Sequence, residues 1–152
     1  MKNNKGFSLV ELIIVIAIMA VLVGVLAPTY MQYVEKSKKS NDVSTVDTLV
    51  NAFEIAAIDP ETQADTWTSI KIELSNGADM KLTATPTGSA TKMEAAVKAI
   101  VPTSTRFKSA KWGGTVEITA TKGDNGKVTF AYGTNQASKD FKAYATSISK
   151  IS

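Results

Sequence analysis

The fold is decided near the start of the chain, where residues 5–28 read KGFSLVELIIVIAIMAVLVGVLAP. Sixteen consecutive residues, from Leu12 to Ala27, carry no polar side chain. Together with residues 7–11 they would form about 31 Å of helix, enough to cross a hydrocarbon core of roughly 30 Å. Because such a helix is apolar on every side, it cannot lie on a protein surface as an amphipathic helix does. The sequence therefore predicts a helix that is buried in a membrane or in an assembly.

The composition of the whole chain excludes several kinds of active site. None of the 152 residues is cysteine or histidine, which excludes disulfides, thiolate nucleophiles, zinc–thiolate sites and Ser-His-Asp triads. The net charge of +3 arises from 17 basic and 14 acidic residues, and no basic stripe with interleaved aromatic residues is present. We therefore expect no specific nucleic-acid partner.

Three interpretations of the apolar N-terminus compete. A basic start and an apolar run fit a cleavable signal peptide, but this run is longer than the usual ~7–15 residues, and Ala27 leads directly into Pro28. A plain single-pass anchor is the second interpretation, in which Lys2 and Lys5 keep the N-terminus cytoplasmic. The third must account for Glu11, because a carboxylate at the edge of a membrane helix is costly without a partner.

The residues around Glu11 carry a resemblance to a known family. The run KGFSLVEL at residues 5–12 resembles the prepilin cleavage motif of type IV pilins and pseudopilins, and its short leader is similar to that of the type IVa branch. The resemblance implies a leader peptide over residues 1–6, cleavage after Gly6 by a membrane peptidase, and N-methylation of the new N-terminal Phe7. It is specific over the first thirty or so residues, where the family's helix proline also has a counterpart.

A glutamate four residues beyond the new N-terminus is a hallmark of that family, and Glu11 stands at this position. Cleavage would leave a cationic amine on Phe7, which we expect to meet Glu11 of a neighbouring subunit in an apolar bundle. Each buried charge then needs the other, since a wrong register leaves one of them uncompensated. The expected assembly residues are Phe7, Glu11 and Pro28, the last because proline should kink or interrupt the long helix. The alternative is that Glu11 merely lies among lipid headgroups.

Four segments are expected. Residues 1–6 are the leader, and residues 7–28 are the membrane or filament-core half of a long helix. Residues 29–58 are its amphipathic half, with an apolar stripe comprising Val43, Val46, Leu49, Val50, Phe53 and Ala57. The solvent face is expected to hold Asp42, Ser44, Asp47, Asn51 and Glu54. Asp59-Pro60 should end the helix, which would then run from Phe7 to Ile58.

Residues 59–152 predict a small head in which helices and strands are mixed. Alternating apolar residues indicate strands at 70–74, 80–82, 116–120 and 128–132, with Asn76-Gly77 as a turn after the first. A capping box from Thr91 to Glu94 predicts a helix closed by Pro102, and Ser138 is the expected N-cap of a last helix through Ile148. The predicted fold class is therefore α+β, with the amphipathic half of the long helix packed on a small antiparallel β-sheet head.

No pattern in the sequence points to catalysis, and we expect a protein that is not an enzyme and binds no cofactor or metal. Nucleotide-binding glycine motifs and an EF-hand pattern are absent from the chain. Asp59, Glu61 and Asp65 cluster within seven residues, but a polar loop explains them better than a cation site. The basic run at residues 36–41 could meet lipid headgroups or acidic subunit surfaces, and a solvated face is the simpler interpretation.

The resemblance therefore implies the structural subunit of a type IV pilus. Its expected partners are further copies of the chain in a helical filament, the prepilin peptidase and N-methyltransferase, the assembly platform with its motor ATPase, and membrane lipid before assembly. The precursor is expected to cross the cytoplasmic membrane once with its N-terminus inside, and the product to be an extracellular filament. Two alternatives remain open: a pseudopilin of a secretion or competence machine, and a membrane-anchored binding domain that never polymerises.

Overall fold

The computed structural model describes residues 6–148, so that residues 1–5 of the expected leader lie outside the described part. The first helix, α1, spans Leu9–Ile58 without a break. The chain divides between Ser37 and Lys38 into two compact units, which are described separately.

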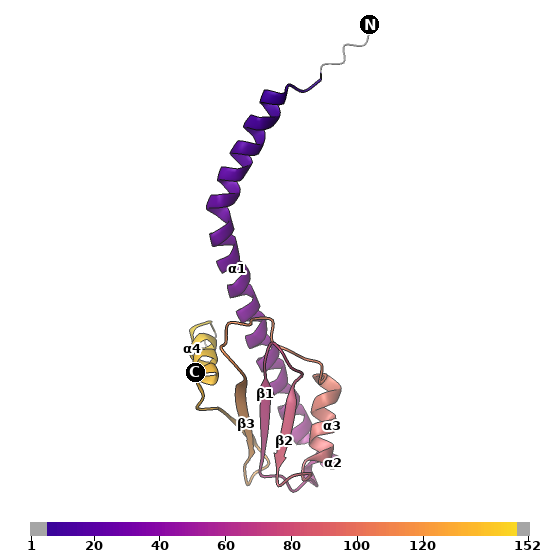
Figure 1. Cartoon of the computed structure of the whole chain (residues 1–152). Coiled ribbons are helices and arrows are strands. Elements are labelled where there is room, and N and C mark those ends of the chain that lie inside the picture. Colours follow the sequence, from indigo (N-terminus) through magenta and orange to yellow (C-terminus); the bar gives the residue numbers. More distant parts are fainter. Residues whose placement is uncertain (1–5, 149–152) are drawn as a thin grey trace. The chain divides into compact units, whose positions relative to one another are not determined.

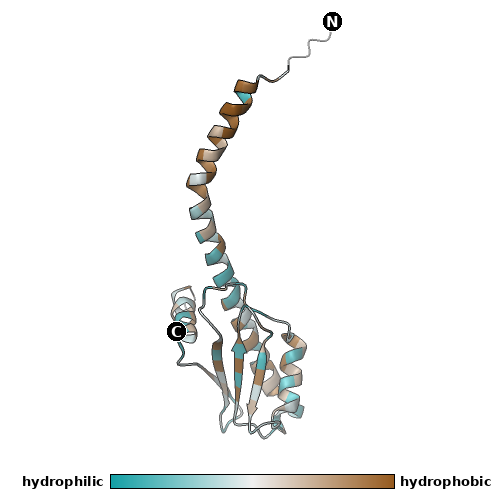
Figure 2. Cartoon of the chain, viewed as in Figure 1, coloured by the Kyte–Doolittle hydropathy of each residue, from teal (hydrophilic) through white to brown (hydrophobic). Residues whose placement is uncertain are grey.

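The first unit consists of the apolar half of α1 and the residues that precede it. Every residue from Gly6 to Tyr33 is exposed, and Figure 2 shows the hydrophobic colour along this half of α1. By length and composition α1 can cross a membrane, and none of its most apolar window is buried. Pro28 lies inside α1 and does not interrupt it, although its missing N–H leaves the Gly24 carbonyl without the usual helical donor.

The head contains one four-stranded sheet in the order β2-β1-β3-β4. Each pair of neighbouring strands is antiparallel, as the register of Ile72 opposite both Leu82 and Ile118 illustrates. Figure 1 shows β1, β2 and β3 side by side. The predicted strands are confirmed, and their bounds are Ser69–Leu74 for β1, Lys81–Thr85 for β2, Val116–Lys122 for β3 and Val128–Tyr132 for β4.

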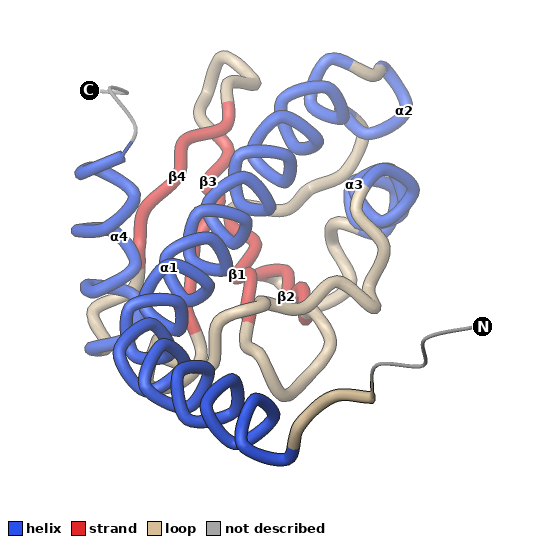
Figure 3. The backbone as a smooth tube through the Cα atoms, turned by 90° about the horizontal axis from the view of Figure 1, so that it is seen from above, coloured by secondary structure: helices blue, strands red, loops and turns tan. Residues whose placement is uncertain are grey.

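Three further helices complete the head. They are α2 at Pro60–Gln63, α3 at Thr91–Ile100 and α4 at Gln136–Ile148. Figure 3 shows α4 on the β4 side of the head and α3 on the β2 side, with the head part of α1 between them. The long helix ends at Ile58 as predicted, and the Asp59 side chain then accepts a hydrogen bond from Glu61 N, which caps α2. This architecture confirms the α+β fold class.

The core lies between one face of the sheet and the stripe of α1. Phe53 of α1 is fully buried and meets Phe130 of β4 edge to face, with ring centroids 5.9 Å apart. The predicted stripe is confirmed, with Val50 and Ala57 at its half-buried margin. Because side chains alternate along a strand, the apolar side chains of the strands face this same layer. Trp67 and Trp112 are both buried in it.

The other face of the sheet is polar and charged. Lys71 of β1 lies 2.6 Å from Glu117 of β3 and 3.2 Å from Glu73 on its own strand. The hydrogen bonds that the Lys71 ammonium donates to Glu117 and Glu73 raise the pKa of Lys71. Such exposed pairs contribute little to stability, so that cohesion of the head comes from the apolar face.

Two predicted details of the head are wrong: the N-cap of α3 and the start of β2. Thr91 is the first residue of α3 and not its N-cap, and Glu94 pairs with Lys98 at 3.0 Å. The free N–H of Met93 instead donates to the Asp65 carboxylate at 2.8 Å, from outside the helix. Met80 is buried as expected, but it precedes β2.

The predicted N-cap of α4 is also wrong. Ser138 lies inside the helix, and its N–H donates to the side chain of Asn135 at 2.8 Å. Asn135 thus caps the helix three residues earlier, as asparagine commonly does. The Ser138 hydroxyl accepts a hydrogen bond from Glu117 N of β3 at 2.8 Å, so that this serine joins α4 to the sheet.

Titration of Tyr132 in β4 is expected to make the head less stable at alkaline pH. Burial raises the pKa of Tyr132, and the charge of Asp47 raises it further. Since the folded protein disfavours the phenolate, the stability is complete below the unfolded pKa of about 10 and is lost as the pH rises toward the folded pKa. We expect Tyr132→Phe to lose less stability than the wild type between pH 9 and pH 11 in urea unfolding. An equal loss in Tyr132→Phe and in the control Tyr33→Phe would contradict this assignment.

Candidate functional site

The bond predicted to be cleaved lies between Gly6 and Phe7, and both residues are exposed. Gly6 precedes α1, and Phe7 is 93% exposed. A Cβ atom added to Gly6 would meet nothing within 4 Å. The chain at this bond is therefore accessible to another protein, and its conformation does not itself require glycine.

Ser8 and Glu11 form a capping box at the start of α1. Ser8 N donates to Glu11 Oε2 at 2.8 Å, and Val10 N donates to Ser8 Oγ at 3.3 Å. This reciprocal arrangement satisfies backbone donors that the first helical turn leaves free. The expected partner of Glu11 was another subunit, and the intrachain bond to Ser8 was missed although the S-x-x-E spacing at residues 8–11 indicates it.

The capping box also determines where the Glu11 carboxylate lies. Among the described residues, the hydrogen bond that Glu11 accepts from Ser8 N uses Oε2. The position in the first turn is favourable for a negative charge, because the helix dipole is positive there. The geometry therefore holds the carboxylate three residues from Ser8, with Oε1 available to a second donor. Pro28, the other expected assembly residue, lies farther along α1.

Asp42 contradicts the expectation that it faces solvent. It is fully buried, and its carboxylate accepts three hydrogen bonds from one loop of the head. Lys108 N donates to Oδ1 at 2.6 Å, while Ser109 N and Trp112 Nε1 donate to Oδ2 at 3.0 and 2.8 Å. Because a buried carboxylate needs such donors, Asp42 joins α1 firmly to the loop. We call this loop, residues 107–112, the latch loop.

Aromatic rings of the latch loop pack against α4. The Phe107 ring stacks on Phe141 of α4 with centroids 5.3 Å apart, and Trp112 contacts the same Phe141 ring at 4.9 Å. The Lys39 ammonium lies over Trp112, 4.5 Å from the ring centroid, and 5.7 Å from that of Tyr144. These contacts tie the beginning of the head part of α1 to both the latch loop and α4.

Two of the three acids that the sequence groups near the end of α1 serve as helix caps. Asp59 accepts from Glu61 N, and Asp65 accepts from Met93 N, so each carboxylate satisfies a helix terminus. Within residues 6–148, no group of three or more acidic side chains is placed to hold a metal ion.

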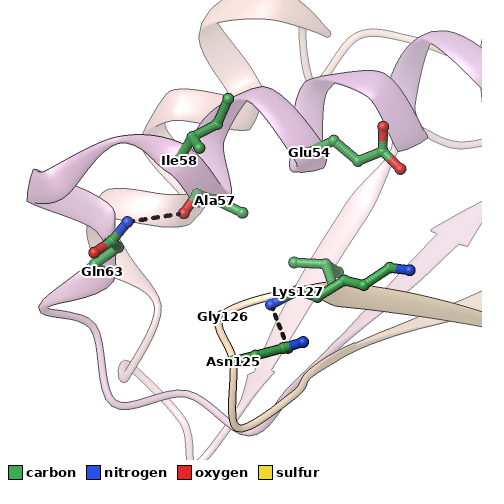
Figure 4. Close-up of a pocket in the computed structure, with 8 residues that line it drawn as sticks. Glu54, Ala57, Ile58, Gln63, Asn125, Gly126 and Lys127 are labelled. Carbon is green, nitrogen blue, oxygen red and sulfur yellow. Dashed lines mark hydrogen bonds between the residues drawn. The ribbon is translucent and has the colours of Figure 1, made fainter.

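An open pocket of about 410 Å³ lies beyond the end of α1. Figure 4 shows Glu54, Ala57, Ile58 and Gln63 on one side and the β3–β4 loop with Lys127 on the other. The lining mixes one acid, one base and a small apolar floor. Nothing in this arrangement resembles a catalytic constellation, since nucleophile and base pairs are absent from the lining.

Comparisons with known proteins agree with the N-terminal features. Residues 1–27 match the model of the family described as the prokaryotic N-terminal methylation motif. A fimbrial protein of Pseudomonas aeruginosa is 39% identical over 59 residues, covering 39% of this chain and 38% of the relative. The type IV major fimbrial protein FimA of Dichelobacter nodosus is 33% identical over 69 residues, covering 43% and 44%.

Fimbrial protein Q of Moraxella bovis is 36% identical over 62 residues, covering 41% of this chain and 40% of the relative. The chain thus spans less than half the length of the curated relatives it matches. No solved structure shows a significant match. The chain thus carries the N-terminal methylation motif over residues 1–27, is similar to type IV fimbrial proteins over part of its length, and packs a long apolar-ended helix on an antiparallel head, an architecture consistent with the pilin fold.

Proposed function

We propose that the chain is a structural subunit of a type IV pilus, cleaved after Gly6 and polymerised into an extracellular filament. One observation carries this proposal: an uncovered apolar helix begins at a capping box that holds a carboxylate four residues from Phe7. An exposed apolar surface of this length needs lipid or protein around it. The similarity to fimbrial proteins supports protein as the final environment.

The assembly step follows from the charges. Before cleavage the Phe7 nitrogen is a neutral amide, so the Glu11 carboxylate lacks a cationic partner. Cleavage would create an amine at Phe7, and we propose that this amine pairs with Glu11 Oε1 of a neighbouring subunit while Oε2 retains its bond to Ser8. In an apolar bundle the pair strongly disfavours other registers, since they bury unpaired charges. Pro28 would provide a weak point in the helix for extension of the filament.

In this proposal the chain has a structural role, and other proteins carry out its processing and its extraction from the membrane. A prepilin peptidase and N-methyltransferase would process the precursor, and a platform with a motor ATPase would extract it from the membrane. The precursor would cross the cytoplasmic membrane with its N-terminus inside, as the positive-inside rule favours for a lysine-bearing leader.

Gly6→Asp is expected to block cleavage and thereby filament formation. The peptidase must accommodate the residue before the cut, whereas the free chain has space for a side chain at Gly6. Intact-mass spectrometry of membrane-extracted protein should find the mature chain starting at N-methylated Phe7 in the wild type and the full precursor in Gly6→Asp. The matched control is Gly77→Asp, because Gly77 also has nothing within 4 Å of an added Cβ. Normal processing of Gly6→Asp would contradict the proposed cut.

Electron microscopy of sheared surface material separates the candidate roles. Long filaments that contain the mature chain would support the pilus subunit. A processed chain that forms no surface filament would favour a pseudopilin, and an unprocessed Met1 terminus would favour a plain membrane anchor.

A further inference from the structure

Four lysines gather where the head part of α1 begins. Lys38 and Lys39 lie on α1, and Lys108 and Lys111 lie in the latch loop; we call these four residues the lysine patch. Lys38, Lys108 and Lys111 are exposed, and Lys39 is half-buried. The two pairs are far apart in sequence, so that only the folded head places them together.

The bonds of Asp42 bring the two halves of the lysine patch together. Asp42 stands one helical turn after Lys38, and it accepts hydrogen bonds from the backbone of Lys108 and from Trp112 Nε1. Lys39 reaches over the Trp112 ring at 4.5 Å. Two backbone N–H groups and the Trp112 indole N–H therefore satisfy Asp42, which is fully buried and is the only acidic residue among residues 38–46. The lysine patch consequently presents its positive charge outward.

Ion pairs within the described part of the head lie elsewhere. Lys71 and Lys81 of the sheet, Lys98 of α3 and Arg106 each lie within 4 Å of a carboxylate. Within residues 6–148, no salt bridge is found for Lys38, Lys108 or Lys111. Cations without a protein counter-ion can attract an anionic surface.

The chain itself limits how far the lysine patch can lie from the apolar half of α1. Lys38 lies ten residues after Pro28, and these ten steps span at most roughly 36 Å when fully extended, or about 15 Å as a helix. In a precursor held by its apolar half, this tether is short enough for Lys38 to reach the headgroups at the side where the chain leaves the membrane. Attraction to anionic lipid acts within about 8 Å at physiological salt.

We infer that the lysine patch docks the head of the unassembled subunit on anionic phospholipid headgroups. This inference rests on the membrane-inserted precursor of the proposed function. The docked head would lie against the bilayer until assembly, when extraction of α1 removes the lipid and exposes the lysine patch again. Each lysine near an anionic surface gains about 1 kcal/mol, equivalent to roughly fivefold in an equilibrium constant.

The test uses the full chain reconstituted as single copies in nanodiscs of phosphatidylcholine, or of equal parts phosphatidylcholine and phosphatidylglycerol. A brief pulse of a water-soluble amine-reactive reagent, read lysine by lysine by mass spectrometry, measures accessibility. We expect Lys108 and Lys111 to be labelled about fivefold more slowly in the anionic discs. Lys92 and Lys127, at the other end of the head part of α1, should be labelled equally in both discs. Salt at about 1 M should remove the difference, because it shortens the electrostatic screening length to about 3 Å.

Paired variants test the lysine patch directly. The double variant Lys108→Gln with Lys111→Gln should reduce the protection of Lys38 to twofold or less, whereas Lys92→Gln with Lys127→Gln should leave it unchanged. Equal labelling in the two discs would overturn the inference while leaving the proposed function intact. If protection of the patch lysines rises with the number of chains per disc, the lysine patch docks on a second copy of the chain and the inference is overturned.

Equal protection by inorganic phosphate in neutral discs would overturn the inference in favour of binding a free anion. Failure of the chain to co-elute with discs would refute membrane insertion itself.

Discussion

Glu11→Ala is expected to abolish surface filaments while the chain still inserts into the membrane. Removal of the carboxylate leaves the Phe7 amine of a neighbouring subunit without a counter-charge in an apolar bundle, which costs several kcal/mol for each subunit added. Insertion depends on the sixteen apolar residues after Glu11, and they are unchanged. Electron microscopy should show no filaments, and membrane flotation should show a normal amount of subunit.

Glu11→Gln separates the two roles that the geometry gives to Glu11. Glutamine can still accept the Ser8 N–H, because its side-chain carbonyl stands where Oε2 accepts at 2.8 Å. It carries no charge, however, and cannot neutralise an amine. If the charge pair sets the register, Glu11→Gln fails to form filaments as Glu11→Ala does.

Two outcomes would contradict this assignment of Glu11. Normal filaments from Glu11→Ala would show that neither role is needed. Filaments restored by Glu11→Gln would show that the helix cap, and not the charge pair, is what assembly requires. Glu54→Ala is the matched control, since Glu54 is an exposed acid on the same helix. This variant should form filaments normally.

Asp42→Ala is expected to destabilise the head by about 3–5 kcal/mol, which is a large part of the stability of a domain of this size. The substitution strands three buried donors: the N–H groups of Lys108 and Ser109 and the indole N–H of Trp112. It also leaves a void at a fully buried position. The midpoint temperature of thermal unfolding should fall by roughly 10–20 °C. It is measured on the full chain in detergent by near-UV circular dichroism.

The matched control is Asp47→Ala, on the same helix. Burial raises the pKa of Asp47, which means that the fold disfavours its ionised form. Its removal should therefore change the stability by no more than about 0.5 kcal/mol. Asp42→Asn should lie between the two, because one side-chain oxygen remains while the amide group faces a backbone donor. Equal stability of Asp42→Ala and Asp47→Ala would contradict the proposed role of the carboxylate.

The periodic parts of the fold could be predicted from sequence because burial follows local spacing. Alternation at residues 70–74, 116–120 and 128–132 predicted three strands, and the 3–4 spacing after Val43 predicted the buried stripe of α1. The Asp-Pro pair predicted where α1 ends. In each case neighbouring residues decide which face is apolar, so that distant residues are not needed.

The burial of Asp42 could not be predicted from local spacing alone, although its position in the sequence is compatible with it. The spacing 42-46-49-53 places it on the apolar stripe, but an isolated acid is ordinarily expected in solvent. Its three donors lie 66 to 70 residues away, and no local pattern connects them. The true caps of α3 and α4 escaped prediction for a similar reason, because Asp65 reaches α3 across 28 residues and Ser138 is used by the sheet.

The N-terminal motif and the apolar run are decided by the sequence itself. The N-terminal methylation motif, the position of Glu11 and the sixteen apolar residues are features of the local sequence, and the hydropathy of that run does not depend on the head. Tertiary structure alone decided that Asp42 is buried and that lysines from two distant segments form one patch. The physical reason is that a buried charge is stable only where folding supplies its hydrogen-bond donors, and here those donors come from a loop that reaches α1 only in the folded head.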